Sequence, residues 1–372
     1  MQFNLNEMQV MIQDGARRLL AESLDSEQNA AAEDSQEGFP VDIWSQMSQL
    51  GWVGAALPEE VGGGGLSILD LCILAEEIGR AGASLPLVSS SGFSASFLQA
   101  IKGSDFTKDL LGRMASSEVI VTPALIDEES RDERSKPRAV LKSGAQGATL
   151  SGSKVLVPFA QSAQILLVTA LADNGEIIVL AIDRDAKGVN LTRHRATGGH
   201  PVFNVTFDNV AVAKDRVLAT GDAAQDALAK ALDTATILAT AEAVGNCEGM
   251  LLLAADYATT REQFGTKIGS FQAVAHPIAD MRIQTDAIRL LVFEAAWMLD
   301  QGKDVTLAVS ETKAMANEEI VKMVHAGHAV HGAIGYTMEY DLQLFTRRAR
   351  AFCLSYGDTH SQTERAAAAL GL

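Results

Sequence analysis

Hydrophobic residues recur with two different periods along this chain, and the change of period divides it into three parts. In the segment LSILDLCILAEEIGRAG, which begins at Leu66, apolar residues return every three or four positions, as on one face of an amphipathic helix. From residue 119 to 218 the apolar runs are short, rich in β-branched residues and separated by turn signals such as DNG and SGS, which predicts β-strands. After Gly221 the helical period returns almost to the end of the chain.

The positions at which the period changes are the expected domain boundaries. We expect a helical N-terminal domain at residues 1–117, a middle β domain at 118–218 and a C-terminal helical domain at 219–372. A chain of 372 residues, 47% of them hydrophobic, can bury cores of this size. The predicted fold class is α+β, with one β domain between two helical ones.

The composition of the chain limits the classes of partner and the cellular compartment that we expect. The formal net charge of −17 argues against nucleic-acid binding, which needs a basic face to displace counterions. We find no run of about 20 apolar residues that would predict a membrane span, and no signal-peptide pattern at the start. Cys72, Cys247 and Cys353 are isolated among apolar neighbours, which is typical of buried thiols rather than a disulfide framework. We therefore expect a cytoplasmic protein.

Four motifs follow one another in the order that one enzyme family shows. They are GWVGAALPEEVGGGGLSILDLCILAEEIGRAG (51–82), LSGSKVLVPFAQSAQILLV (150–168), YATTREQFGTKIGSFQAVAHPIADM (257–281) and HGAIGYTMEYDLQLFTRRAR (331–350). Together they resemble the acyl-CoA dehydrogenase family over nearly the whole chain. The resemblance implies an N-terminal α-helical domain, a middle β-barrel or sandwich domain and a C-terminal four-helix bundle, with FAD as cofactor. It also implies desaturation of an acyl-CoA thioester, in which a carboxylate removes the α-proton while a hydride leaves the β-carbon for the flavin.

The third motif carries the best-matched candidates for FAD binding. Arg261 follows Tyr257 by one helical turn, and an arginine offers phosphate a forked, permanently charged contact. Phe264 and Gln272 come next. In the family the matching arginine, phenylalanine and glutamine reach the FAD of a neighbouring subunit, which the resemblance implies here. An ordinary helix–turn–helix with a surface arginine is the alternative.

Two other segments resemble flavin-binding parts of the family but depart from its pattern. Gly332 and Gly335 in HGAIGY match a glycine loop that lets the backbone approach the dinucleotide. Val157 and Pro158 stand on the strand that faces the flavin, where the family usually has a tryptophan-isoleucine-threonine or a serine. The segment VTPALIDEESRDERSKP is long and charged where many members carry a glycine-containing flavin segment. We expect this half of the FAD site to be less complete than the half given to a neighbour.

Both family positions for the catalytic base hold residues that cannot accept a proton. They match Gly357, in YGDTHSQTER, and Ala235. Asp358 is adjacent to the first position, and Glu242 lies nearly two helical turns beyond the second, on the same face. A glutamate buried in ILATAEAVG would have a raised pKa, which suits a base. A salt-bridged structural glutamate and a turn-forming aspartate are the alternatives.

The resemblance also bears on partners. Some bacterial members that act on bulky or dicarboxylic acyl-CoA substrates, such as steroid side chains or pimelate, are α2β2 heterotetramers whose paralogous subunits divide the FAD-binding and catalytic residues. We therefore expect an acyl-CoA substrate, an electron-transfer flavoprotein as acceptor, and either a homotetramer or an α2β2 heterotetramer. A non-catalytic partner that completes the FAD site of a catalytic paralogue is the alternative function. A related oxidase that uses oxygen is a further alternative.

Two clusters invite other interpretations. His325, His328 and His331 form HxxHxxH on a predicted helix, but the third drifts off the face of the first and no acidic partner has fitting spacing. We therefore predict no metal site and treat them as helix-face or cofactor-edge residues. The basic cluster RRAR (347–350) could meet a CoA phosphate or an acidic partner face, or could simply end a solvated helix.

Overall fold

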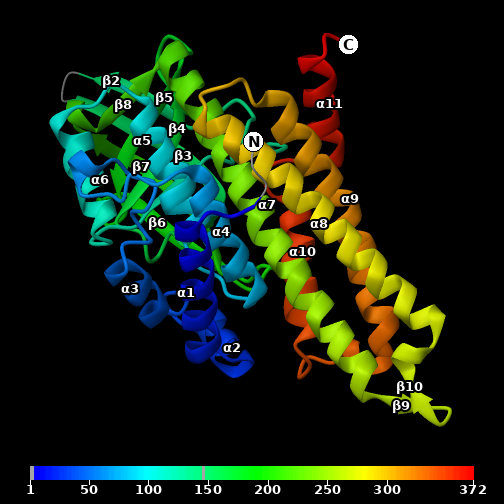
Figure 1. Ribbon diagram of the computed structural model, residues 1–372. Helices are drawn as coiled ribbons and strands as arrows, with labels where there is room; N and C mark the ends of the chain where they lie inside the picture. Colours follow the sequence, from blue (N-terminus) through cyan, green and yellow to red (C-terminus); the bar gives the residue numbers. More distant parts are fainter. Residues whose placement is uncertain (1–3, 145–146) are drawn as a thin grey trace.

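In the computed structural model, which describes residues 4–144 and 147–372, the chain runs from helices into a β-sheet and back into helices (Figure 1). This order confirms the predicted fold class. Local capping signals start several of the helices: Asn6, Asp25 and Ser67 each form a capping box with the residue three positions on. The N-terminal part consists of α1 (Glu7–Ser23), α2 (Ser26–Asp34), α3 (Val41–Gln49), η1 (Glu59–Val61), α4 (Ile68–Arg80), η2 (Leu87–Ser94), α5 (Ala95–Ala100) and α6 (Asp105–Ala115).

The middle part is one connected sheet of eight strands. Its strands are β1 (Val121–Ala124), β2 (Val140–Gly144), β3 (Gly147–Pro158), β4 (Ile165–Leu171), β5 (Ile177–Asp183), β6 (Val189–His194), β7 (Val202–Val212) and β8 (Val217–Thr220), with η3 (Lys214–Arg216) before the last. The order is β6-β7-β3-β2-β4-β5-β8, and β1 pairs parallel to β4. The buried Lys154 of β3 donates to Asp127 at 2.6 Å and to the Leu125 carbonyl at 2.9 Å. This ion pair anchors the chain that leaves β1 to the inside of the sheet.

The C-terminal part is built around one very long helix. Its elements are α7 (Gly221–Thr260), the hairpin β9 (Glu262–Gln263) and β10 (Thr266–Lys267), η4 (Ile268–Ser270), α8 (Gln272–Asp300), α9 (Thr306–His331), η5 (Gly332–Tyr336), α10 (Leu342–Leu354) and α11 (Thr359–Ala369). By length and composition α7 passes for a membrane span, unlike the expectation from the sequence. Most of that stretch is buried among the other elements, so α7 is a core helix.

The helix α4, from the N-terminal part, packs directly on α7 through two glycines. A Cβ atom on Gly79 would lie 1.8 Å from the Glu242 carbonyl oxygen, and one on Gly245 would lie 1.7 Å from the Glu76 carbonyl oxygen. Only residues without side chains allow the two backbones to come this close. The largest hydrophobic cluster includes residues of all three parts, and the division into domains at 117 and 218 stays a prediction.

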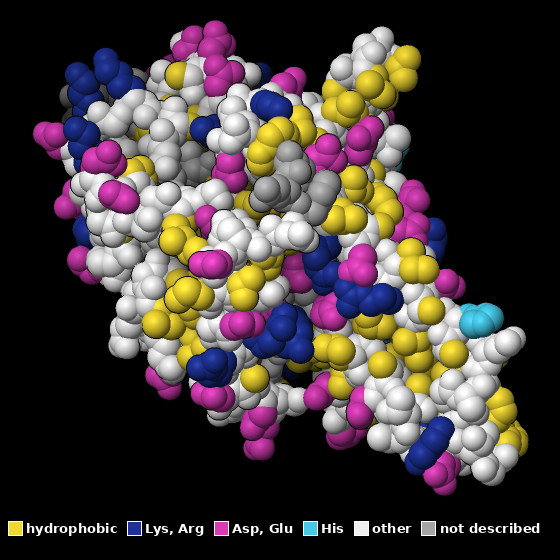
Figure 2. Space-filling view, viewed as in Figure 1, with side chains coloured by type: hydrophobic (Ala, Val, Ile, Leu, Met, Phe, Trp, Pro, Cys, Tyr) yellow, Lys and Arg dark blue, Asp and Glu magenta, His cyan; other side chains and the backbone are white. Residues whose placement is uncertain are grey.

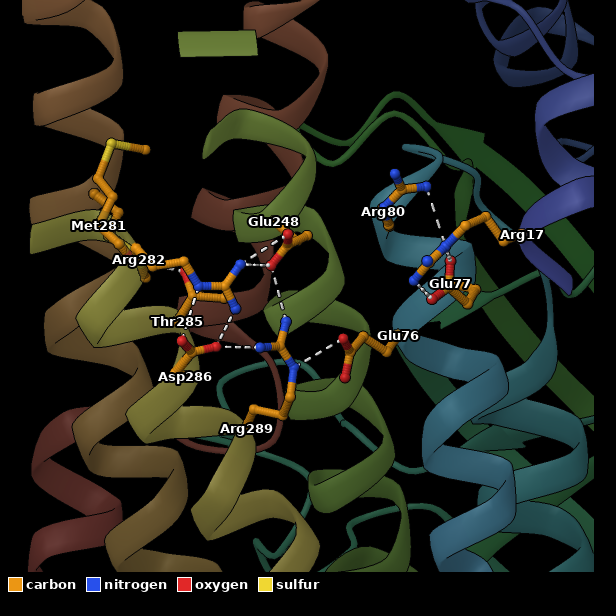
Figure 3. A network of polar contacts seen from close by, with 11 residues as sticks. Arg17, Glu76, Glu77, Arg80, Glu248, Met281, Arg282, Thr285, Asp286 and Arg289 are labelled. Atoms are coloured by element: carbon orange, nitrogen blue, oxygen red, sulfur yellow. Dashed lines mark hydrogen bonds and ion pairs between the residues drawn. The ribbon is translucent and has the colours of Figure 1, made fainter. Parts of the chain in front are cut away.

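A network of charged side chains also joins α4 to α7 and α8 (Figure 3). Arg289 of α8 donates to Glu76 of α4 and to Glu248 of α7, each at 2.9 Å, and also contacts Asp286. Arg282, two turns earlier on α8, donates to Glu248 at 2.9 Å. The middle of α7 is therefore held in place from two sides.

Candidate functional site

The structure separates the predicted site residues into two groups. Arg261, Phe264, Gln272, Gly332 and Gly335 lie at the end of the helical bundle that carries β9 and β10, far from the sheet (Figure 1). The end of α7, the start of α8 and the end of α9 meet there in a small apolar cluster. Val157 and Pro158 at the end of β3, Glu242 in the middle of α7 and Asp358 before α11 form the second group, which is defined only by lying outside that bundle end.

The first group is open to contact from another molecule. Arg261 is exposed and forms no ion pair with any residue of 4–144 or 147–372. Phe264 is 93% exposed, and its ring meets the edge of the Phe271 ring, with 6.2 Å between the ring centroids. Gln272 is exposed at the first position of α8. A free guanidinium, a free ring and a free amide fit the pyrophosphate and adenine of a dinucleotide.

The distance between the two groups bears on which subunit would bind such a dinucleotide. The stretch of α7 between Glu242 and Arg261 is about 28 Å long, at 1.5 Å per residue. One chain thus presents its exposed arginine far from its own candidate base. The arrangement suits a dinucleotide that is bound by a neighbouring subunit.

The end of strand β3, which carries Val157 and Pro158, presents one exposed apolar side chain. Val157 is buried, while Leu156 is 56% exposed and has a left-handed backbone, with φ of 55°. Pro158 has no N–H, and its carbonyl accepts a hydrogen bond from the Thr122 hydroxyl at 2.6 Å. This strand can pack against a flat apolar ring, but Pro158 offers it no donor.

The charged segment 127–138, which follows β1, forms ion pairs with two helices of the C-terminal part. Arg134 donates to Asp233 of α7 at 2.6 Å. Arg131 donates to Glu364 of α11 at 3.3 Å. These ion pairs explain why the segment is rich in charge: it pairs with helices that lie 99 and 233 residues later in the chain.

Hydrogen bonds also hold the turn at Tyr356 and Gly357, which contains the vacant base position. The Tyr356 N–H donates to Glu133 of the charged segment at 2.9 Å, and the Tyr356 carbonyl accepts from Gln362 at 2.6 Å. Gly357 has φ of 92°, and a Cβ there would lie 2.8 Å from side-chain atoms of Ser361 and Gln362. A glutamate at this position would be strained and crowded. The conformation of this turn therefore disfavours the glutamate that the family carries at this position.

Glu242 is one of the few residues in the middle of α7 that keep some solvent exposure. From Leu232 to Leu251 only Ala239, Glu242 and Glu248 keep some exposure, and Glu248 belongs to the network of Figure 3. Ala239 and Glu242 are three residues apart, hence on one face. Burial raises the pKa of Glu242 to about 7, against the opposing effect of the Arg348 charge. The Glu242 carboxylate has no hydrogen-bond partner in the described part of the chain, so it is free to accept a proton.

Asp358 has a different environment. Its carboxylate caps α11 by accepting from the Ser361 N–H at 2.8 Å, and Arg131 lies 3.7 Å away. The cap lowers the pKa of Asp358. Its side chain is about half exposed, which suits a helix cap better than a base.

Three residues near Glu242 were not among the sequence predictions. Glu133 and Tyr356 are half-buried, and the charges of Glu133 and Glu242 add to the burial that raises the pKa of Tyr356. Arg348 was noted only as part of the basic cluster. That cluster is mostly not a solvated helix end: Arg347 and Arg348 both pair with Glu33 of α2. No local signal could have found these neighbours, because their partners are distant in sequence.

The histidines of α9 have partners in the fold. His328 contacts the Thr346 hydroxyl at 2.8 Å and stacks on Tyr336, and His331 contacts the Gly327 carbonyl at 2.7 Å and stacks on Tyr257. Within residues 4–144 and 147–372, no group of three His, Cys, Asp or Glu side chains is arranged to hold a metal. The stacked rings form part of the bundle end that carries Arg261.

Comparison with known proteins extends these observations to the whole chain. Residues 6–118 match the family model "Acyl-CoA dehydrogenase, N-terminal domain", and residues 226–371 match "Acyl-CoA dehydrogenase, C-terminal domain". The chain is 28% identical over 367 residues to benzylmalonyl-CoA dehydrogenase of Aromatoleum aromaticum, covering 96% of each chain. It is 30% identical over 370 residues to 3-sulfinopropanoyl-CoA desulfinase of Paraburkholderia xenovorans, covering 95% of this chain and 94% of the other.

Solved structures agree. The chain is similar to a variant of the Tcur3481-Tcur3483 steroid ACAD, with a TM-score of 0.87, 29% identity and 98% of each chain covered. It is also similar to a structure described as the electron transferring flavoprotein of Acidaminococcus fermentans, with a TM-score of 0.92 and 25% identity, covering 100% of this chain and 99% of that one.

Proposed function

The chain belongs to the acyl-CoA dehydrogenase family and is an FAD-dependent oxidoreductase of acyl-CoA thioesters, and from that premise we propose that Glu242 is its catalytic base. The observation that carries this proposal is the partial exposure of Ala239 and Glu242 on one face of an otherwise buried stretch of α7, where the Glu242 carboxylate has no hydrogen-bond partner among the described residues and a pKa of about 7. A base works best when its pKa is close to the working pH.

The chain's own residues would divide the work as follows. Ionised Glu242 accepts the α-proton of the thioester on a carboxylate oxygen. Arg348 favours the ionised form of Glu242 by its charge. Hydrogen bonds hold the segment 127–138 against α7 and against the turn at Tyr356. FAD, when bound, supplies the acceptor for the hydride that leaves the β-carbon.

We also propose that the enzyme is a tetramer in which this chain pairs with a paralogous subunit, as α2β2. The exposed Arg261, Phe264 and Gln272 then complete the FAD site of the neighbour. The closed turn at Gly357 and the donor-free Pro158 support a division of labour between unlike subunits. The similar steroid ACAD carries a paired name, Tcur3481-Tcur3483, in keeping with this proposal.

The electron acceptor and the compartment belong to the same proposal. An electron-transfer flavoprotein is the acceptor we propose, and the similarity to the structure described as that of Acidaminococcus fermentans supports it. We place the enzyme in the cytoplasm. The free thiols of Cys72, Cys247 and Cys353 support this, since reducing compartments keep cysteines unpaired.

The test of the base is Glu242→Gln in the FAD-loaded assembly, with Asp358→Asn as the matched control. We expect Glu242→Gln to lower kcat by about 10²- to 10⁴-fold, the usual contribution of a general base, with FAD content and melting temperature unchanged. Asp358→Asn should keep kcat within about twofold, because the amide oxygen can still cap α11. Normal turnover in Glu242→Gln together with loss in Asp358→Asn would assign the base to Asp358 instead.

The test of the assembly is the FAD content of the chain purified alone and after co-expression with a paralogue from the same genome. We expect little FAD per chain alone and a yellow tetramer after co-expression. About one FAD per chain in a homotetramer would contradict the α2β2 proposal and leave the base assignment untouched.

A further inference from the structure

The helix α2, at the lower edge of the view in Figure 1, is held to the rest of the chain by polar contacts rather than by an apolar face. Its sequence, SEQNAAAED, contains no hydrophobic residue larger than alanine, and Asn29 is its one buried residue. None of its residues belongs to the hydrophobic clusters of the described chain. The Asn29 amide donates to the Ala81 carbonyl, at the end of α4, at 3.3 Å. The helix therefore lacks the apolar packing from which most helices in proteins gain their stability.

Two arginines at the end of β6 contact the C-terminal end of α2. Arg193 donates to the carbonyl of Glu33 at 3.0 Å and to that of Ser35 at 2.7 Å. Arg195 pairs with the Asp34 carboxylate at 3.0 Å. The last carbonyls of a helix carry partial negative charge and attract cations. This end of α2 is thus held by charge, from a strand that follows it by about 160 residues.

The Glu33 carboxylate makes the most enclosed of these contacts. Its side chain is 12% exposed, and Arg347 and Arg348 of α10 lie 3.0 and 3.1 Å from its two oxygens. A Cβ atom on Gly199 would overlap the same carboxylate, so the glycine leaves the space in which the carboxylate sits. The ion pair of Asp34 is exposed on both sides, and such pairs contribute little and are screened by salt. The position of α2 therefore depends chiefly on Glu33.

The chain at both ends of α2 allows the helix to move as a unit. A capping box closes its start, and the Ser35 N–H and hydroxyl both donate to the Ala32 carbonyl at its end. These caps lie within the helix and its flanking residues, so they persist when the arginines let go. A cavity of about 390 Å³ borders Gln36 and Glu37, and the Glu37 carbonyl accepts from the Ser162 hydroxyl at 2.9 Å. The movable part therefore ends at Gln36, beside free space.

We propose that α2 is a lid, which opens and closes over the arginines of β6 and α10 while the rest of the chain stays folded. In the closed state it pairs four guanidiniums with two carboxylates and two carbonyls, and in the open state it uncovers them. Segments with few buried apolar contacts open at a lower free energy than the core of a protein. The inference stands apart from the proposed function, because it concerns neither the base nor FAD.

The experiment is hydrogen–deuterium exchange of the whole chain, in the oligomeric state in which it purifies. Exchange of the amides of α2 is compared with exchange of α1 and α4, which are its neighbours in sequence and in space. The test variant is Glu33→Gln. The matched control is Asp34→Asn, which removes the same charge from the same helix end but from an exposed ion pair.

We expect Glu33→Gln to speed exchange of the α2 amides by about 10- to 100-fold, the effect of one charge-assisted contact with an enclosed partner. Exchange of α1 and α4 should change by less than about threefold, and Asp34→Asn should change α2 by less than about threefold. Raising sodium chloride from about 0.05 to about 0.5 M should speed exchange of α2 alone in the wild type, by about three- to tenfold.

Two results would overturn the lid: α2 amides that exchange together with α1 and α4 in every variant, or equal effects of Glu33→Gln and Asp34→Asn. The first would mean that α2 opens only when the N-terminal helices unfold, and the second that Glu33 does not hold it. If Glu33→Gln does not fold, the salt response of the wild type and Arg193→Gln decide. Arg193→Gln removes contacts to two carbonyls of this helix end and leaves Glu33 paired; it should also speed exchange of α2 alone, and no effect there together with no salt response would equally overturn the lid.

Discussion

Glu242 and Asp358 show how strongly the surroundings of a residue decide its chemistry. Each is a carboxylate close to one of the two positions that the family uses for its base, Asp358 beside Gly357 and Glu242 beyond Ala235. Asp358 is stabilised as an anion by the start of α11, whereas Glu242 lies in a buried stretch of α7 that stabilises its neutral form. Relative to the same side chains in a free peptide, the pKa of Asp358 is therefore lowered and the pKa of Glu242 is raised.

The raised pKa of Glu242 predicts the pH dependence of the reaction. A base must be ionised to accept the α-proton, and Glu242 loses its own proton only as the pH rises through about 7. We expect kcat/KM to fall about tenfold per pH unit below pH 7 and to level off above it. A pH–rate profile of the FAD-loaded assembly measures this. A profile that is flat from about pH 5.5 to 8.5 would exclude Glu242 as the base.

At the scale of elements, the crossing of α4 on α7 fixes where Glu242 stands. Gly79 and Gly245 let the two backbones touch, and the charged network around Arg289 locks the same crossing from the side of α8 (Figure 3). The carbonyl of Glu242 itself lies against Gly79. The position of the candidate base along α7 thus depends on a helix that lies well over a hundred residues earlier.

This crossing predicts a large effect of a single methyl group. In Gly245→Ala the new Cβ would overlap the Glu76 carbonyl, so α4 must move away, which costs about 3 kcal/mol of the free energy of unfolding or more. The matched control is Gly112→Ala in α6, where the nearest atom lies 3.5 Å away. There the helix propensity of alanine should add about 0.5–1 kcal/mol. Urea unfolding measures both. Equal stability of the two variants would contradict the close crossing.

At the scale of the whole molecule, apolar side chains remain uncovered on the helical bundle. Ile283 and Leu290 on α8 and Leu252 on α7 are 66%, 46% and 43% exposed. Figure 2 shows hydrophobic side chains along the α8 side of the molecule. Isolated apolar residues are common on surfaces, but Ile283 and Leu290 are two turns apart on one face of α8. This face is suited to contact with another subunit.

We therefore expect Ile283→Glu to weaken assembly. A carboxylate buried in an apolar contact must lose its hydration, which opposes association. Size-exclusion chromatography with light scattering should show dimers or monomers in place of tetramers at micromolar concentration. The exposed, charged residue Lys303 offers a control, since Lys303→Glu also adds negative charge to the bundle. Tetramers in Ile283→Glu, or dissociation in both variants, would remove this face from the interface.

The sequence by itself determined the order of helices and strands and the family, and it predicts an FAD-binding role for the exposed motif that contains Arg261 and Gln272. These features depend on local spacing: the helical period around Leu66, the β-branched runs from residue 119, and the motif that contains Arg261 and Gln272. A helix or a turn forms largely according to its own residues and their sequence neighbours, so its signals can be read directly from the sequence.

Only the tertiary structure decided what surrounds the candidate base. Glu133 reaches the turn at Tyr356, and Arg348 reaches Glu33, across separations of more than a hundred residues. Burial and pKa are properties of such distant contacts, since they depend on which side chains exclude water from a group. For this reason the sequence offered one carboxylate near each of the two vacant positions, and the fold distinguished a helix cap from a candidate base.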